Sequence, residues 1–241
     1  MIRHSAIEML GWMVPAEVFI AGTRQIRVAM KFDSLLEIVA DEPVFDTGLL
    51  LSGEADPAGI RQQLARWTRA GRIQQLRREL YVLAPPYRKR TPHPFLVANR
   101  LVRGSYVSGV SALAHANCIP EYVPEVTSVG AGRPQLRRTP LGRFSFRHVK
   151  VDLLYGYRQV DLGQGQTASV ALPEKALLDV VHLCPGGDEP AYIAELRLDF
   201  ETLDLDELDR LAQAAGRPKL LRAARHVRSL AEDPTLSYEA L

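Results

Sequence analysis

The sequence has few cysteines and no long apolar run. Only Cys118 and Cys184 occur among its 241 residues, and no cysteine–histidine cluster has the spacing of a zinc site. No apolar stretch approaches the ~20 residues that cross a bilayer, so no membrane-spanning segment is expected. With 46% hydrophobic and 24% charged residues, the composition is that of a folded globular protein. We therefore expect a cytoplasmic protein that holds no metal and no cofactor.

Catalytic motifs are lacking as well. Gly130-Ala131-Gly132 is much shorter than a phosphate-binding loop and is interpreted as a turn. Glu174, Lys175 and Asp179 open a predicted helix, but adjacent side chains on a helix diverge by ~100°, so they are not expected to converge on one metal. We interpret these three residues as capping and solvated surface residues, and we expect no enzyme. Four histidines are also too widely separated for HxH or HExxH spacing: His93, His115, His148 and His182.

The pattern of residues 30–84 predicts a winged helix-turn-helix domain. Asp56 and Pro57 are typical of a helix start, and Gly71 is typical of its end. Three helices followed by a small hairpin are the elements of that fold. The predicted elements are helices over residues 34–41, from about Thr47 and over 57–70, then strands over 72–76 and 80–83.

The rest of the chain divides into three parts. Residues 1–29 are an N-terminal extension, which is either sequence upstream of a natural start at Met30 or a genuine extra helix. Residues 85–94 form a basic, proline-rich linker. Residues 95–241 form a larger mixed α/β domain, so the fold class is α+β. Its predicted elements are helices over 95–102, 108–116, 173–183, 204–215 and 218–231, and strands over 126–129, 143–149 and 167–170.

Charge is distributed unevenly along the chain. The formal net charge is only +2, but residues 57–90 carry nine basic residues and one acid, a local charge of +8. The remainder of the chain therefore carries −6. A concentrated basic module in a nearly neutral protein is typical of nucleic-acid binding.

The third predicted helix has the residues that read DNA. Its helical period places Ile60, Leu64 and Trp67 on one buried face. The opposite face offers arginine and glutamine, which bind guanine and adenine edges in the major groove. The alternatives are a solvated basic face or a winged helix that contacts protein. The predicted DNA contacts are Arg61, Gln62, Arg66 and Arg69 on the helix, Arg72 after it, and Arg77 and Arg78 at the hairpin tip.

A second basic strip lies in the larger domain. Residues 126–151 contain no acid, and strand alternation would place Arg143, Ser145 and Arg147 on one face. That face could lie along phosphates, or it could be a solvated hairpin balanced by acids elsewhere. The strip consists of Arg133, Arg137, Arg138, Arg143 and Arg147. Near the C-terminus, acids at 199–209 precede a basic helix, which favours pairing between neighbouring helices.

Several blocks, in a specific order over about residues 31–230, resemble AbiEi-type antitoxins. The blocks are LARWTRAGRI (64–73), LYVL (80–83), FLVANRLV (95–102), SYVS (105–108), SAL (111–113), IPE (119–121), PEKALLD (173–179) and ELRL (195–198). Glu79 stands where that family usually has glycine in the hairpin turn. Because a positive φ would strain glutamate, we expect a longer or reshaped wing here.

The resemblance implies a function. The family belongs to type IV toxin–antitoxin systems, so it implies a bacterial protein that represses its own operon through the winged helix. If a second copy or the second basic strip engages an adjacent half-site, the operator should contain inverted repeats. It also implies a partner, an AbiEii-type toxin similar to nucleotidyltransferases, which the C-terminal domain counteracts. Two other functions stay open: a one-component regulator whose larger domain binds an effector, and a nuclease or nucleotidyltransferase that would use Glu174 or Asp179.

Overall fold

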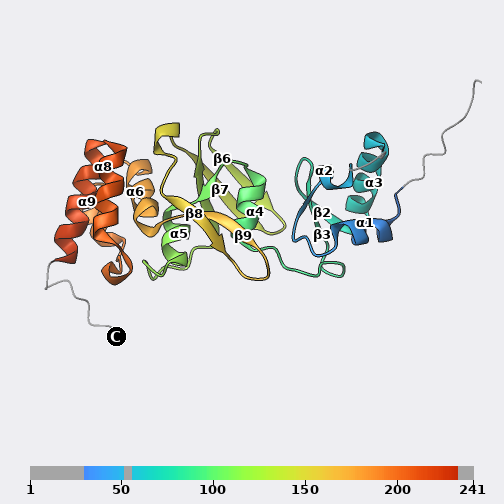
Figure 1. Cartoon of the computed structure of the whole chain (residues 1–241), viewed down its shortest axis with the longest axis horizontal. Coiled ribbons are helices and arrows are strands. Elements are labelled where there is room, and N and C mark those ends of the chain that lie inside the picture. Colours follow the sequence, from blue (N-terminus) through green and yellow to red (C-terminus); the bar gives the residue numbers. More distant parts are fainter. Residues whose placement is uncertain (1–29, 52–55, 233–241) are drawn as a thin grey trace, which may run out of the picture.

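A computed structural model of the chain describes residues 30–51 and 56–232, so the prediction for residues 1–29 lies outside the described residues. The described chain is a mixed α/β structure with one three-stranded and one six-stranded sheet. The elements are arranged in line (Figure 1): the small sheet with α1 to α3, the large sheet with α4 and α5, and then helices α6 to α9.

The N-terminal unit consists of three helices and a small antiparallel sheet of order β1-β3-β2. The expected helices and strands are all present, with bounds shifted by one or two residues. The two-residue strand β1 was not expected. The elements are α1 (Phe32–Val39), β1 (Phe45–Asp46), α2 (Thr47–Leu50), α3 (Pro57–Arg69), β2 (Ile73–Arg77) and β3 (Leu80–Leu83).

Local chemistry explains the bounds of α3 and of the hairpin. The Asp56 carboxylate accepts a hydrogen bond from the Ala58 amide at 3.1 Å, and Gly71 takes a φ of +69° just after the last turn. The hairpin turn contains only Arg78 and Glu79, and Glu79 itself has a φ of +66°. The expected lengthening of the hairpin is therefore wrong, because glutamate adopts the left-handed conformation at a cost of about 1–2 kcal/mol. The hairpin is instead irregular next to the turn, where the pairing of β2 with β3 shifts register between Gln75 and Arg77.

The larger half is built on a mixed sheet of order β6-β7-β5-β4-β9-β8, in which β5 pairs with β7 and β4 with β9 in parallel. Its strands are β4 (Tyr106–Val107), β5 (Glu125–Gly130), β6 (Gln135–Thr139), β7 (Gly142–His148), β8 (Tyr157–Asp161) and β9 (Thr167–Ala171). The expected strands correspond to β5, β7 and β9. Sequence analysis missed β4 and β8, and it left β6 without bounds.

Helices surround this sheet and close the chain. The first, α4 (Pro94–Leu101), packs on β4, β5 and β9, and α5 (Gly109–His115) packs on β5 and on α6 (Pro173–Leu183). The short α7 (Pro190–Glu195) was not expected; it contacts α9 (Pro218–Ala231), which also packs on α8 (Leu205–Ala215). The predicted pairing between the last helices is confirmed, because Arg228 bridges Asp206 at 2.9 Å and Asp209 at 2.6 Å.

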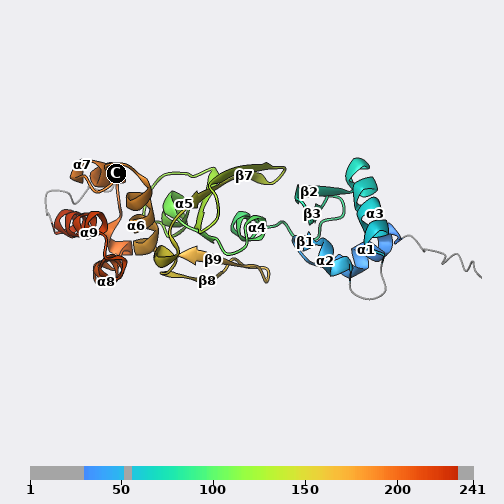
Figure 2. The ribbon, with the colours of Figure 1, turned by 90° about the horizontal axis from the view of Figure 1, so that it is seen from above.

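The small sheet joins the two halves, because each of its faces packs into a different hydrophobic core. Phe45, Ile73 and Leu83 pack with helices α1 to α3 in the N-terminal core. The alternate residues Leu80 and Val82 belong to the core of the larger half, together with Val44 and Leu76. Strand alternation produces this division. Figures 1 and 2 show the sheet between α3 and α4.

Candidate nucleic-acid interface and the domain junction

The outer face of α3 is the candidate surface for nucleic acid. Ile60, Leu64 and Trp67 are 5%, 0% and 7% exposed, so the predicted buried face is confirmed. The predicted opposite face is exposed to solvent along its length and consists of Gln62, Ala65, Arg66 and Arg69, with Arg61 at its flank. The helix therefore presents polar groups without any acid across about two turns.

Two of the remaining predicted contacts also lie on the surface. The Arg72 guanidinium stacks 4.9 Å from the centre of the Phe32 ring, which fixes its direction beside the end of α3. Arg78 in the hairpin turn is 91% exposed, and its Nε lies 3.8 Å from the Glu79 carboxylate. An ion pair as exposed as this is weak, so Arg78 is available to a phosphate.

Arg77 occupies a different place from the other predicted contacts. Its guanidinium donates to the Arg100 carbonyl oxygen, at 3.2 and 3.1 Å, at the C-terminal end of α4. It also donates to an Asp46 carboxylate oxygen at 3.4 Å, and its side chain is only 22% exposed. A guanidinium at the last carbonyls of a helix satisfies unpaired acceptors and opposes the helix dipole. Arg77 therefore attaches the hairpin to α4.

The basic residues of the linker, like Arg77, form contacts within the protein. Arg88 donates to the Leu83 carbonyl at 2.9 Å, and Arg90 donates to the Gln164 carbonyl at 2.9 Å. Lys89 and Arg90 both lie within 3.4 Å of Asp41 carboxylate oxygens. Arg90 therefore connects the linker to both halves, whereas Arg88 and Lys89 hold it to the N-terminal unit.

The second basic strip follows strands β6 and β7. Phe144 and Phe146 are buried, while Arg143 and Arg147 are exposed, so the predicted alternation is confirmed. Arg143 pairs with Glu125 at 3.3 Å. Arg133, Arg138 and Arg147 form no ion pair within the described residues, and the Arg137 side chain bonds only to that of Gln135 there, at 2.7 Å.

A buried charged cluster lies beneath the sheet, where exposed residues were expected. Glu174, Lys175 and Asp179 are only 4%, 2% and 2% exposed, so their interpretation as solvated surface residues is wrong. The adjacent side chains of Glu174 and Lys175 do diverge on α6, but each is buried against other parts of the protein. Glu174 accepts from the Asp204 amide at 2.8 Å, whereas Lys175 lies 5.3 Å from the Tyr155 ring centre.

Lys175 and Asp179 form the ionic centre of this cluster. Their side chains are in direct contact one helical turn apart, a spacing that favours ion pairs. The other Asp179 oxygen accepts hydroxyl hydrogen bonds from Ser108 at 2.7 Å and from Tyr106 at 3.1 Å. Burial lowers the pKa of Lys175, and the Asp179 charge opposes that change. Burial, followed by the Asp179 charge, raises the pKa of Tyr106.

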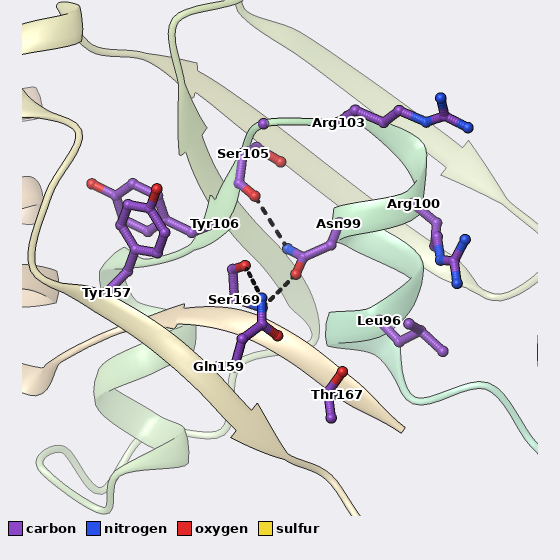
Figure 3. Close-up of a pocket in the computed structure, with 11 residues that line it drawn as sticks. Leu96, Asn99, Arg100, Arg103, Ser105, Tyr106, Tyr157, Gln159, Thr167 and Ser169 are labelled. Carbon is purple, nitrogen blue, oxygen red and sulfur yellow. Dashed lines mark hydrogen bonds between the residues drawn. The ribbon is translucent and has the colours of Figure 1, made fainter. Parts of the chain in front are cut away.

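A polar pocket of about 340 Å³ opens between α4 and strands β8 and β9 (Figure 3). Arg100 and Arg103 lie at one end, at the end of α4, and the rings of Tyr106 and Tyr157 stack at the other. Amide and hydroxyl side chains line the space between: Asn99, Gln159, Thr167 and Ser169. Sequence analysis did not identify this pocket, because its residues come from segments about 60 positions apart.

Metal-binding and membrane-spanning features are not found in the described ranges. No group of three or more His, Cys, Asp or Glu side chains within residues 30–51 and 56–232 could hold a metal ion. Over the same ranges, no helix has both the length and the apolar character that a bilayer crossing requires.

Comparison with known proteins gives no assignment. No protein-family model matches the chain, and no curated protein matches its sequence.

Proposed function

We propose that the chain is a DNA-binding repressor whose N-terminal unit is a winged helix-turn-helix. The observation that carries this proposal is the exposed face of α3, with Gln62, Arg66 and Arg69 opposite a fully buried apolar face. Three helices followed by a β-hairpin match the order of elements in that DNA-binding class. In this function α3 enters the major groove and the hairpin lies along the backbone.

Each exposed residue has a distinct role in this proposal. Gln62, Arg66 and Arg69 read base edges, because amide and guanidinium groups form paired hydrogen bonds with adenine and guanine. Phosphates are contacted by Arg61, Arg72 and Arg78. Arg77 positions the hairpin on α4 rather than contacting DNA, because its guanidinium is already bonded within the protein. The strip on β6 and β7 offers further phosphate contacts, through Arg133, Arg137, Arg138, Arg143 and Arg147.

The biological setting follows from the resemblance to AbiEi-type antitoxins. We propose that the chain represses its own operon at inverted repeats in the bacterial cytoplasm. The larger half then counteracts a nucleotidyltransferase-like toxin. This function needs no catalytic group, metal or cofactor in the chain. Co-expression with a toxin encoded beside its gene tests this part: growth should be rescued by the full chain and not by an empty vector.

Titration of the full-length protein against the DNA upstream of its own gene tests the repressor function. Fluorescence anisotropy over a range of salt concentrations should show specific binding with a steep salt dependence. Arg66→Ala and Arg69→Ala should each weaken binding by about 1–3 kcal/mol and relax the preference for one base pair.

The chain offers a matched control. Arg225 on α9 is an exposed helical arginine whose Nε donates to the carbonyl four residues earlier, at 3.2 Å, as that of Arg69 does at 3.3 Å. Arg225→Ala therefore removes the same charge and the same local bond away from α3, and its operator affinity should equal that of the parent. Equal affinity for operator and scrambled duplex, or unchanged affinity in Arg66→Ala, would contradict the proposal.

A further inference from the structure

An excess of positive charge lies at the junction between the two halves. The Asp46 carboxylate, from the N-terminal unit, is the shared partner of three guanidinium groups. Arg77 and Arg103 approach it to 3.4 Å, and Arg100 approaches it to 3.8 Å. Within the described residues, Arg100 and Arg103 have no other ion-pair partner. One carboxylate therefore faces three cations, which leaves a local excess of two positive charges.

Two of these cations also line the polar pocket. Arg103 is 76% exposed, and Arg100 is 45% exposed, so neither guanidinium is enclosed by its contact with Asp46. Guanidinium groups bind phosphate through paired charge-assisted hydrogen bonds of about 2.7–2.9 Å, whereas their contacts with the shared Asp46 carboxylate are longer, at 3.4–3.8 Å. The cationic end of the pocket thus has the donor groups that a phosphate requires.

The opposite end of the pocket is a fixed aromatic surface. Tyr157 is 47% exposed and stacks on Tyr106 with ring centres 4.5 Å apart and planes inclined by 13°. Tyr106 cannot shift easily, because it is buried and its hydroxyl donates to Asp179. An exposed tyrosine held in one orientation is a stacking surface for a nucleobase.

Uncharged polar groups connect the two ends. The Asn99 carbonyl oxygen accepts from the Ser169 amide at 2.6 Å, and Gln159 donates to the Ser169 hydroxyl at 2.9 Å, so these side chains are held in place. The Thr167 side chain forms no hydrogen bond with residues 30–51 and 56–232, which leaves its hydroxyl for a ligand. A cavity of about 340 Å³ is at the small end of the range for ligand sites. Its size favours a single nucleotide over a polymer.

We propose that this junction pocket binds a nucleoside monophosphate, with its phosphate on Arg100 and Arg103 and its base on Tyr157. The bound phosphate competes with Asp46 for the two guanidinium groups. Binding therefore weakens the ionic contact between the N-terminal unit and α4. Only the expected readout of this change, an altered operator affinity, rests on the proposed repressor function.

Isothermal titration calorimetry of the full chain tests the site without DNA. The probes are AMP, GMP, CMP and UMP, with the matching nucleosides and inorganic phosphate as separate titrations. At least one nucleotide should bind tenfold or more tightly than its nucleoside and than phosphate. The double variant Arg100→Gln/Arg103→Gln and the variant Tyr157→Ala should each weaken that binding at least tenfold, whereas Arg225→Gln should not change it.

Asp46→Asn gives the most discriminating result. Removing the competing carboxylate should strengthen nucleotide binding several-fold, whereas a residue with only a structural role would weaken binding or leave it unchanged when replaced. Thermal unfolding of each variant shows that the fold is intact. No binding of any of the four nucleotides, or no gain in Asp46→Asn, would overturn the proposal. Inorganic phosphate that binds as tightly as the nucleotides would overturn the nucleotide assignment.

The DNA measurement separates the two proposals. In the parent protein, the nucleotide that binds should change operator affinity at least threefold, and it should not do so in Arg100→Gln/Arg103→Gln. Nucleotide binding without operator binding refutes the repressor and leaves the site standing. If Arg100→Gln/Arg103→Gln weakens operator binding while no nucleotide binds, these arginines contact DNA and the pocket proposal fails.

Discussion

Replacing Asp179 with alanine removes the acceptor that Lys175, Tyr106 and Ser108 share. Three donors depend on this carboxylate: the Lys175 ammonium, the Tyr106 hydroxyl and the Ser108 hydroxyl. All four side chains are at most 2% exposed, so water cannot replace the lost acceptor without opening the structure. The substitution therefore leaves one cation and two hydroxyl groups buried and unpaired.

The expected loss of stability is at least about 4 kcal/mol. Removing one partner of a buried ion pair costs about 3–5 kcal/mol, and each buried hydroxyl left unsatisfied costs about 1–3 kcal/mol. Loss of the Lys175 proton offsets part of this sum, because burial already lowers the pKa of that ammonium group. Since domains are stable by about 5–15 kcal/mol, the variant should lose a quarter or more of its stability.

Urea unfolding followed by circular dichroism measures this loss as a lower midpoint with an unchanged slope. Lys175→Met alone should also lower the free energy of unfolding. The double variant Lys175→Met/Asp179→Ala should lose clearly less stability than the two single variants together, because each single variant already removes the Lys175–Asp179 ion pair. Glu195→Ala, an exposed carboxylate on α7, should change stability by less than about 0.5 kcal/mol. A loss below about 1 kcal/mol in Asp179→Ala, or additive losses, would refute the reasoning.

Three further predictions concern the N-terminal unit and the start of α4. Glu79→Gly should raise the free energy of unfolding by about 1 kcal/mol in urea titrations, because glycine adopts the positive φ of this turn without strain; a lower unfolding midpoint would contradict it. Arg77→Ala should destabilise the protein by about 1–3 kcal/mol and leave the salt dependence of operator binding unchanged. Arg78→Ala should lower the slope of that salt dependence by about one and leave stability unchanged. A lower slope in Arg77→Ala and an unchanged slope in Arg78→Ala would show that Arg77 contacts DNA. Burial, followed by the charge of His115, lowers the pKa of His93 below its ordinary 6.5. The unfolded chain therefore binds more protons than the folded chain at mildly acidic pH. The contribution of His93 to stability is consequently lost as pH falls below about 6.5. The His93 Nδ1 caps α4 by accepting a hydrogen bond from the Phe95 amide at 3.1 Å. Melting temperatures between pH 8 and pH 5 should fall less in His93→Asn, which keeps a capping acceptor but does not titrate, and equal falls would exclude this role.

Features that depend on neighbouring residues in the chain could be predicted from the sequence. The two faces of α3 follow from the spacing of Ile60, Leu64 and Trp67, and the bounds of α6 follow from Pro173 and the apolar period behind it. Strand β4 was not predictable in this way. It has two residues, too few to show a period, and it exists because β5 and β9 pair with it from either side.

Long-range contacts account for the functional assignments that changed. Arg77 was expected at DNA because its neighbours in the sequence are basic, but its partners are the Arg100 carbonyl, 23 residues away, and the Asp46 carboxylate, 31 residues away. Lys175 and Asp179 were expected in solvent because charged residues are rarely buried. Their spacing of four residues was a usable signal for an ion pair, but only the fold shows that protein surrounds it.

The double burial of the small sheet limits how this protein can be divided. Val44, Leu76, Leu80 and Val82 are at most 7% exposed only because the larger half covers them. A fragment that ended after residue 84 would expose these four side chains, each at a cost of about 1.5–3 kcal/mol. It would also present them as one contiguous apolar patch, a surface on which proteins associate. The N-terminal unit is thus not a module that can be moved to another protein intact: any transplant must carry α4 with it or redesign this face as a polar surface.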